Sequence, residues 1–364
     1  MKRIIFFILL ISTLMVGCTV MSDSEPSMVD EDQNRLGYVE FLNENEIFVR
    51  KINKMPDREH YRFRYVEFLN ESELLVMKQN RESLRTKKIE LLDINSGTVK
   101  QIYEGELSED PGNHLSILNA DDNNLLISGY EAALVVSKDQ AAFEEIRFER
   151  DIWANAFLPD GNLLCFDNGK VYIFDLNSRE IQHLLDIRPA QNLVNCWFKI
   201  NCDGTEALFV AAKENYDIEV YRIDLVNNSF RLIYDKRSIA FWQNENILLV
   251  HEGIFQEYPA KLDIMNHDDL TLTSKNYSDK QAINIIDISK DIIQINVIDK
   301  TSSGDTYLQI LDINLNEILR ISNIRYIIGG SISPSSRKIA FIAYLGDDDY
   351  PSLCIIDLDK QNGN

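Results

Sequence analysis

Short apolar segments alternate with polar turns along most of the chain, and the same arrangement returns at regular intervals. Each unit begins with an apolar strand, a polar turn and a second apolar strand, as in Phe157–Cys165 (FLPDGNLLC) and Ile332–Ile342 (ISPSSRKIAFI). Such runs around Asp-Gly or Ser-Ser predict antiparallel hairpins. Further copies of this first hairpin are predicted at 68–76, 117–127, 200–210, 242–250 and 286–295.

A third strand in each unit gives a second, independent register, because it usually ends in an aspartate. These aspartates are Asp93, Asp175, Asp224, Asp312 and Asp357, with a weaker copy ending at Asp263 and a copy at Ser137 that lacks the acid. Asp93 and Asp357 lie 264 residues apart, which is six steps of 44 residues. Trp153, Trp197 and Trp242 repeat at intervals of 44 and 45 residues. A period near 44 with four short strands per unit is typical of propeller blades.

The seven copies predict an all-β fold, a β-propeller of seven four-stranded blades. The last copy stops at Asp359 after its third strand, while Gly37–Ile52 contains strand-like sequence without a unit of its own. We expect this N-terminal segment to supply the missing strand and close the ring, which removes an exposed edge. Tyr38–Asn43 and Tyr65–Asn70 are identical, so six or eight blades stay open. The propeller is assigned to residues 36–364.

Two blades carry a resemblance to a known family. Ser333–Ile342 with Leu353–Leu358, and Leu158–Phe166 with Val171–Leu176, resemble the blade motif of TolB-like propellers. By pattern the resemblance extends over residues 60–360, and it implies the propeller fold. TolB proteins carry a separate N-terminal α/β domain for which this chain has no room, so none of their partners or functional residues is carried over.

The first residues have the features of a secretory signal. Lys2 and Arg3 precede the apolar run Ile4–Val16, which is too short for a membrane-spanning helix of about 20 residues. The ending Leu14–Cys18 (LMVGC) resembles the bacterial lipobox, with Met15 where leucine is more common. The resemblance implies removal of residues 1–17, a thioether-linked lipid on Cys18 and acylation, for example by palmitate, of the new amino terminus. An ordinary cleaved signal and an N-terminal anchor helix are the alternatives.

Charge and polarity set the expected surroundings of the folded part. Residues 18–35 are polar and acidic, which predicts a flexible lipidated tether. The net charge of −21 becomes −23 once Lys2 and Arg3 leave with the leader. Such an acidic body repels phosphates, so nucleic acid is excluded as a partner. We expect an extracytoplasmic protein anchored to the bacterial cell membrane.

Four cysteines follow Cys18, namely Cys165, Cys196, Cys202 and Cys354. Outside the cytoplasm an even number permits disulfides, and Cys196 and Cys202 are close enough in sequence to bridge a small loop. The alternative is four small buried apolar residues, which the strand-like surroundings of Cys165 and Cys354 favour.

No catalytic motif is complete. Gly329–Ser333 (GGSIS) is the nearest approach to a nucleophile elbow and lacks its second glycine. His251-Glu252 opens like a zinc-protease motif, but Phe255 occupies the position of the second histidine. The five histidines are dispersed through the sequence, at His60, His114, His183, His251 and His267.

Other candidate ligand sites have simpler interpretations. Asp347–Asp349 and Asp357–Asn362 offer oxygens for calcium, but they are better explained as solvated turns. The three tryptophans could dock a quinone cofactor, but without neighbouring glycines we interpret them as packing residues.

The sequence therefore favours a non-catalytic binding or scaffold module for a protein, peptide or glycan. No catalytic, metal or cofactor-binding residue is predicted, and the ligand-binding residues stay unassigned. The alternatives are an enzyme of lactonase, lyase or hydrolase type with a site at the central channel, and an assembly or sensor component of the cell envelope.

Overall fold

The described part of the chain begins at Tyr38. The computed structural model describes residues 38–42, 46–52, 60–82, 86–106, 116–119, 124–128, 132–137, 143–148, 152–187, 193–201, 203–213, 218–234, 238–253, 259–266, 271–301, 306–346 and 349–359. The predicted leader (1–17), Cys18 and the tether (18–35) lie outside these residues, so their assignment stays a prediction.

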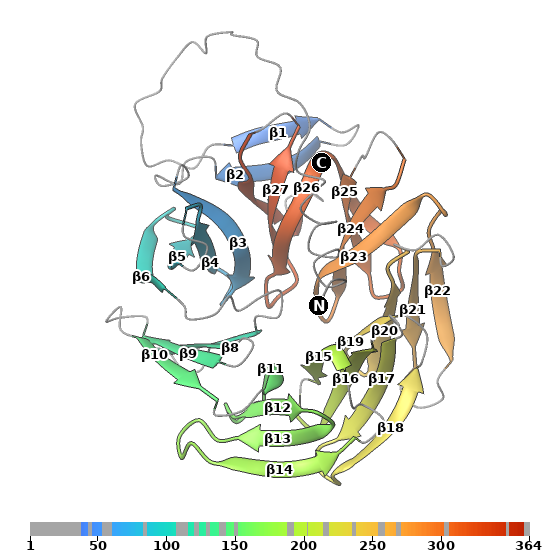
Figure 1. The fold of residues 1–364 in the computed structure, drawn as a ribbon. Helices are drawn as coiled ribbons and strands as arrows, with labels where there is room; N and C mark the ends of the chain where they lie inside the picture. Colours follow the sequence, from blue (N-terminus) through green and yellow to red (C-terminus); the bar gives the residue numbers. More distant parts are fainter. Residues whose placement is uncertain are drawn as a thin grey trace. The chain divides into compact units, whose positions relative to one another are not determined.

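The described residues form antiparallel strands grouped in six hydrogen-bonded sheets (Figure 1). Five sheets have four strands each: β3 (Tyr61–Phe68), β4 (Glu73–Asn80), β5 (Thr86–Asp93), β6 (Val99–Glu106); β7 (Ser116–Asn119), β8 (Asn124–Ser128), β9 (Ala132–Ser137), β10 (Phe143–Arg147); β11 (Trp153–Phe157), β12 (Leu163–Asp167), β13 (Lys170–Phe174), β14 (Ile181–Asp186); β15 (Leu193–Ile200), β16 (Glu206–Lys213), β17 (Ile218–Asp224), β18 (Ser229–Tyr234); and β19 (Ile239–Gln243), β20 (Asn246–His251), β21 (Lys261–Met265), β22 (Leu272–Asn276). The sixth has eight strands: β1 (Tyr38–Leu42), β2 (Glu46–Ile52), β28 (Ser352–Asp357), β27 (Lys338–Leu345), β26 (Glu317–Ile332), β25 (Thr306–Asp312), β24 (Ile292–Asp299) and β23 (Gln281–Ile288).

The eight-stranded sheet contains two blades that share the long strand β26. Residues 317–324 of β26 pair with β25, whereas residues 324–332 pair with β27. The first half of β26 is thus the outer strand of the blade β23–β26, and its second half is the inner strand of the next blade. The predicted β-propeller is confirmed. Counted as hydrogen-bonded sheets, the described residues form six units, which is one of the alternatives for the blade count. Because the eight-stranded sheet contains two blades, the six sheets hold the seven four-stranded units that the repeats predict.

The N-terminal strands complete the last blade. Strand β2 pairs with β28 in antiparallel register, from Val49 opposite Ile356 to Ile52 opposite Leu353. Strand β1, which carries the duplicated sequence, pairs with β2 at the edge of the same sheet. The segment predicted to close the ring therefore occupies the predicted place. Among the described residues the duplication adds a fifth strand to this blade rather than a further blade.

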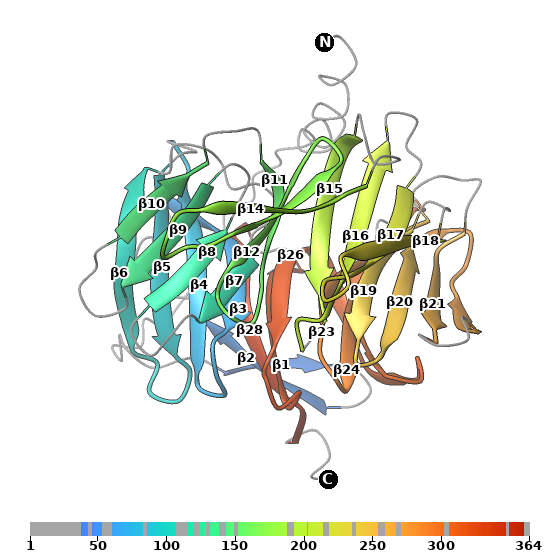
Figure 2. The same cartoon turned by 90° about the horizontal axis from the view of Figure 1, so that it is seen from below.

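Seven buried hydrophobic clusters lie between neighbouring blades of the described structure. For example, Val66 and Leu74 of the first blade pack with Ile342 and Leu353 of the last, which joins the two ends of the ring. Figures 1 and 2 show the blades arranged about a common axis. Each blade lies between two others, so its second strand is covered on both faces and can be apolar throughout. This explains runs such as that of β16, where Ala207–Ala211 is fully buried.

The outermost strands are covered less. In β18 and β22 most residues are exposed, and each of these strands keeps only one or two half-buried positions. Their polar sequences follow from this position at the rim of the propeller. No helix among the described residues has the length and apolar character needed to cross a membrane.

Candidate functional site at the inner strands

The inner strands place a set of side chains at equivalent positions near one end of the ring. The residue before the last of each inner strand is Glu67 in β3, Lys199 in β15, Trp242 in β19, Asp287 in β23 and Ser331 in β26. From Lys199 onward these positions are 43, 45 and 44 residues apart, which is the blade period. Because the inner strands surround the axis, the repeat brings residues from distant parts of the sequence together.

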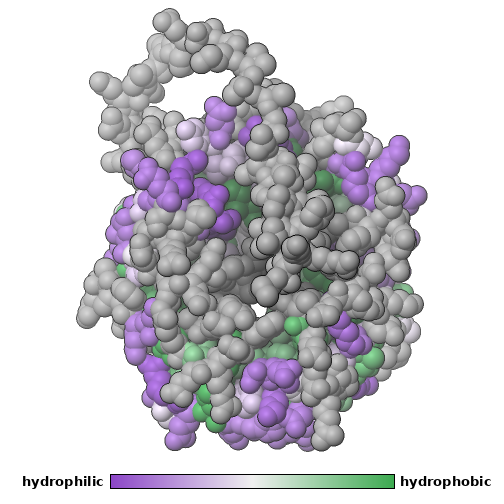
Figure 3. Space-filling view, viewed as in Figure 1, coloured by the Kyte–Doolittle hydropathy of each residue, from purple (hydrophilic) through white to green (hydrophobic). Residues whose placement is uncertain are grey.

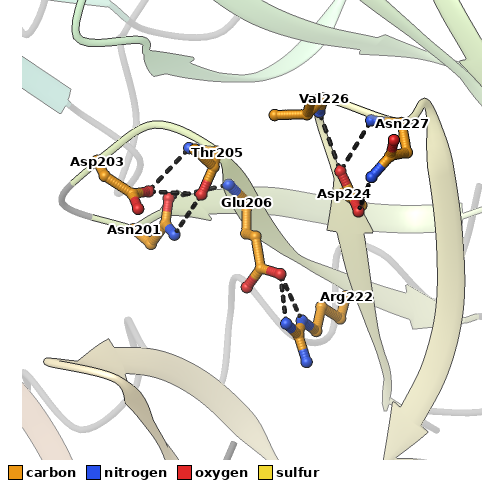
Figure 4. A network of polar contacts seen from close by, with 8 residues as sticks. All are labelled: Asn201, Asp203, Thr205, Glu206, Arg222, Asp224, Val226 and Asn227. Atoms are coloured by element: carbon orange, nitrogen blue, oxygen red, sulfur yellow. Dashed lines mark hydrogen bonds and ion pairs between the residues drawn. The ribbon is translucent and has the colours of Figure 1, made fainter.

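Local turn chemistry ends the inner strand β15 just beyond Lys199 (Figure 4). Asn201 accepts a hydrogen bond from the backbone N–H of Glu206 at 2.9 Å, and Asp203 accepts one from that of Thr205 at 2.9 Å. The Glu206 carboxylate then pairs with Arg222 on the third strand of the blade. These contacts fix the end of β15, and with it the height of Lys199 along the axis.

Several side chains of this set connect one blade to the next. Asp287 Oδ2 accepts a hydrogen bond from the backbone N–H of Ile332 at 2.6 Å, and Ser331 Oγ accepts one from that of Phe68 at 3.0 Å. Trp242 Nε1 donates to the carbonyl of Lys199 at 3.0 Å. The Lys199 ammonium lies 5.3 Å from the centre of the Phe241 ring. The polar residues at this level therefore help to hold the ring together.

Glu67 and Asp287 form an electrostatically coupled carboxyl pair. Burial raises the pKa of Glu67, and the charge of Asp287 raises it further, against the hydrogen bond from Tyr65 and the charge of Lys199. Tyr65 donates to Glu67 Oε2 at 2.8 Å. Burial also raises the pKa of Asp287, although backbone N–H donors at Ile332 and Ile288 oppose this. Two like charges in a poorly hydrated place resist simultaneous ionisation.

Lys199 and Tyr65 complete this group, which we call the axial cluster (Tyr65, Glu67, Lys199 and Asp287). Desolvation lowers the pKa of Lys199, while Asp287 and Glu67 oppose the change. Lys199 is nevertheless exposed to water. Lys199 therefore touches water although protein atoms surround much of its side chain. Burial raises the pKa of Tyr65 well above its usual value.

The inner strand β26 leaves space beside this cluster. A Cβ atom added to Gly329 would meet no atom within 4 Å, whereas one added to Gly330 would lie 2.7 Å from Gln294 Nε2. Gln294 is fully buried and its amide atoms have no hydrogen-bond partner in the described structure. It pairs in register with Asp287. In the space-filling view of Figure 3, the molecule is hollowed near the middle of the face that is drawn.

A pH-dependent stability is expected from the raised carboxyl pKa of Glu67. The folded state holds this proton more tightly than the unfolded state, so stability falls as the pH rises from about 4 toward the raised pKa. Glu67→Gln removes the titrating group. We expect it to be nearly neutral at about pH 4.5 and to stabilise the protein on the order of 1 kcal/mol at about pH 8.5, in chemical denaturation.

Glu317→Gln provides a control of opposite sign. Burial opposes ionisation of Glu317, but hydrogen bonds from Arg320 and Gln309 outweigh it and lower the pKa of this carboxyl. Its replacement should therefore destabilise the protein at neutral and high pH, and the effect should disappear below the ordinary carboxyl range. A Glu67→Gln curve parallel to that of the wild type at all pH values would contradict the coupled pair.

The Ser-His-Asp contact in the fifth blade is structural. His251 Nδ1 lies 2.9 Å from Ser238 Oγ, and its Nε2 lies 3.1 Å from Asp263 Oδ2. Ser238 has no exposed surface, so no substrate reaches its hydroxyl. Burial alone would raise the pKa of Asp263, but hydrogen bonds from His251, Lys261 and Ser274 lower it to about 2. The network stabilises an ionised aspartate inside the sheet.

The repeated aspartates of the third strand stabilise turns. Asp93, Asp175, Asp224 and Asp312 each accept hydrogen bonds from two backbone N–H groups of the turn that follows, at 2.8–3.0 Å. Figure 4 shows this arrangement at Asp224. Asp263, the weaker copy, differs because it lies within β21 and pairs with His251 and Lys261. The aspartate that repeats at the end of the third strand is therefore explained by the turn that it stabilises.

The remaining predicted candidates are dispersed. His183 contacts Asp186 at 2.9 Å on the exposed strand β14, and Asp349 is exposed. Cys165, Cys196 and Cys354 are buried, and burial raises the thiol pKa of the first two. Several predicted candidates lie outside the described residues or have undescribed side chains: His114, His267, Cys202, Asp347, Asp348, Trp153 and Trp197. No group of three metal-ligating side chains occurs among the described residues.

Sequence inspection missed the axial cluster because none of its members lies in a linear motif. The available signal was positional. Glu67, Lys199 and Asp287 each stand one residue before the first hairpin turn, at a place where other units carry small or aromatic residues such as Ala156 and Trp242. Comparing the units column by column would have shown three ionisable residues at one level of the ring.

Comparison with known proteins identifies the fold and leaves the family open. No protein-family model matches the sequence, and no curated protein matches it. The structure is similar to a puromycin-hydrolyzing peptidase of Mycobacterium tuberculosis, with a TM-score of 0.60 and 11% identity over 84% of this chain and 52% of that chain. A prolyl endopeptidase structure aligns with a TM-score of 0.55 and 9% identity, over 80% of this chain and 49% of that chain.

An oligogalacturonate lyase in complex with manganese covers 89% of this chain and 96% of its own, but at 12% identity and a TM-score of 0.43 it supports no argument. The present chain spans about half the length of the two peptidases. At these identities the likeness shows a β-propeller and nothing about activity.

Proposed function

We propose that this protein is an extracytoplasmic lipoprotein, anchored through Cys18, whose propeller binds a cationic group of a protein or peptide ligand at the axial cluster. The observation that carries the proposal is the carboxyl pair Glu67–Asp287, held at one level of the ring by inner strands of different blades. The leader sequence, with its resemblance to a lipobox, supports the anchor.

The charge balance of the axial cluster favours a cation. With both carboxyls ionised and Lys199 protonated, the cluster carries a net charge of −1. Burial raises the pKa of both carboxyls, and the charge of Asp287 adds to the rise at Glu67. An ammonium or guanidinium group would relieve the repulsion and lower both pKa values. Tyr65, Phe241 and Trp242 provide aromatic surface nearby, which suits the apolar part of a lysine or arginine side chain.

A second candidate function rests on the same carboxyl pair. Two carboxyls with different environments are the usual basis of acid–base catalysis. Asp287 accepts backbone hydrogen bonds that favour its charged form, whereas the raised pKa of Glu67 keeps this carboxyl protonated to higher pH. A lyase or hydrolase acting in the channel would use Glu67 as acid and Asp287 as base. Multiple turnover of a substrate that is lost in Glu67→Gln would favour this function over simple binding.

The test of the binding function compares a short peptide containing one central lysine with the same peptide containing norleucine. We expect the lysine peptide to bind in calorimetry, and to bind more tightly at about pH 8.5 than at about pH 6, because both carboxyls are then ionised. Glu67→Gln should weaken this binding by roughly 10- to 150-fold, since a buried charged hydrogen bond is worth roughly 1.5–3 kcal/mol. Glu104→Gln, on the outer strand β6, is the matched control.

Equal binding of the two peptides, or equal losses in the two variants, would overturn the assignment of the site.

The anchor is tested separately in cells. Cys18→Ser should abolish labelling by palmitate and release the protein from the membrane fraction, because a protein without its acyl chains loses about 0.8 kcal/mol of membrane affinity per buried methylene. Persistent labelling of Cys18→Ser would contradict lipidation at this residue.

A further inference from the structure

The positive and negative members of the axial cluster are coupled without direct contact. Desolvation lowers the pKa of Lys199, and the charges of Asp287 and Glu67 both oppose this change, so the three groups lie within electrostatic reach of one another. Among the described residues, however, no ion pair of 4.0 Å or less includes Lys199. A gap therefore separates its ammonium group from the two carboxyls.

Contacts within the ring hold the charged groups on the two sides of this gap. The Lys199 ammonium lies 5.3 Å from the centre of the Phe241 ring, which belongs to the following blade. Asp287 accepts hydrogen bonds from two backbone N–H groups, that of Ile288 at 2.8 Å and that of Ile332 at 2.6 Å. None of these contacts joins the ammonium group to a carboxyl, so the ring itself keeps the opposite charges apart.

The groups around the gap keep hydrogen-bonding capacity for a ligand. Glu67 accepts the Tyr65 hydroxyl at Oε2, and its Oε1 accepts no hydrogen bond from the described residues. The Lys199 ammonium is exposed and donates no hydrogen bond to the same part of the chain. Gln294, the cross-strand partner of Asp287, is fully buried, and neither of its amide atoms has a partner in the described structure. Because buried polar groups are normally hydrogen-bonded, this level of the ring has more polar groups than its own contacts use.

We propose that the axial cluster takes a lysine at the C-terminus of a peptide, with the side-chain ammonium group at Glu67 and Asp287 and the terminal carboxylate at Lys199. The inference rests on the proposed binding function and adds the anionic half of the ligand. A ligand that forms charge-assisted hydrogen bonds of about 2.7–2.9 Å to both sides needs protein charges that do not already touch. A C-terminal lysine carries both charges, and its flexible four-carbon stem adapts their separation to the gap.

The test compares an N-acetylated tripeptide that ends in lysine, as the free acid, with the same tripeptide as the C-terminal amide, in calorimetry at about pH 7.5. We expect the wild type to bind the acid about fivefold more tightly, which is the upper range for an ion pair with an exposed group. Lys199→Met should abolish this preference. It should bind the amide at least as tightly as the wild type does, because the substitution removes a positive charge near the bound ammonium group. Lys199→Gln should behave in the same way.

Lys290→Met is the matched control, because it makes the same change in net charge at an exposed lysine of the hairpin that follows β23. It should keep the preference for the acid.

Three results would overturn the inference. Equal binding of acid and amide by the wild type, or a preference that survives in Lys199→Met, would do so and leave cation binding at the axial cluster intact. Equal tightening of both peptides by Lys199→Met would show that Lys199 is only a counter-charge of the carboxyls. If the wild type binds neither peptide, the proposed function fails together with the inference.

Discussion

Replacing Phe209 with alanine is expected to destabilise the propeller by about 3–5 kcal/mol. Phe209 has no exposed surface and belongs to the cluster between the third and fourth blades. Its ring centre lies 4.6 Å from that of Phe166, 4.9 Å from that of Phe198 and 6.2 Å from that of Tyr221. Truncation removes the apolar burial and also leaves a cavity that two rigid sheets cannot close easily.

Phe230→Ala is the matched control for this prediction. Phe230 lies on the outer strand β18 with 36% of its surface exposed, and its ring contacts Tyr221 at 6.0 Å. Its removal should cost about 1 kcal/mol or less, because little area is lost and water fills the space. Denaturant unfolding monitored by fluorescence measures both variants. Similar losses would mean that the contact between the third and fourth blades contributes little to stability.

The fold could be predicted from sequence because two features of each blade are local. The second strand is buried on both faces and is therefore apolar, as in Leu248–Val250, and the third strand ends in an aspartate that caps its own turn, as Asp224 does. Both features repeat with the blade and need no long-range information. The sharing of β26 by two blades could not be predicted, because the only turn-forming sequence where the pairing changes partner at Ile324 is the short Ser322-Asn323, although Asn323 adopts a positive φ of 63°.

The axial cluster was not predictable in the same way. The sequence separates Glu67 from Asp287 by more than 200 residues, with Lys199 between them. Each of the three looks like an ordinary polar residue beside a turn. Their coupling depends on ring closure and on low hydration near the axis.

Deleting residues 38–52 is expected to prevent the chain from forming a stable soluble propeller. Strand β2 is the strand that covers β28, from Val49 opposite Ile356 to Ile52 opposite Leu353. Without it, β28 becomes an edge with unpaired backbone groups, although Leu353–Ile356 is almost completely buried in the intact ring. An apolar edge of this kind promotes pairing between chains, so we expect aggregation rather than a modest loss of stability.

Deletion of residues 19–33 is the length-matched control, since it removes the same number of residues from the predicted tether. It should leave the unfolding temperature and the molar mass in solution unchanged from the wild type, as judged by circular dichroism and light scattering. A peptide with the sequence of residues 38–52, added during refolding, should restore soluble protein to the 38–52 deletion, because it can pair with the open edge of β28. A soluble monomer with wild-type stability after that deletion would show that the last blade holds without β2. The hydrophobic cluster that packs Val66 and Leu74 against Ile342 and Leu353 would then be sufficient to close the ring.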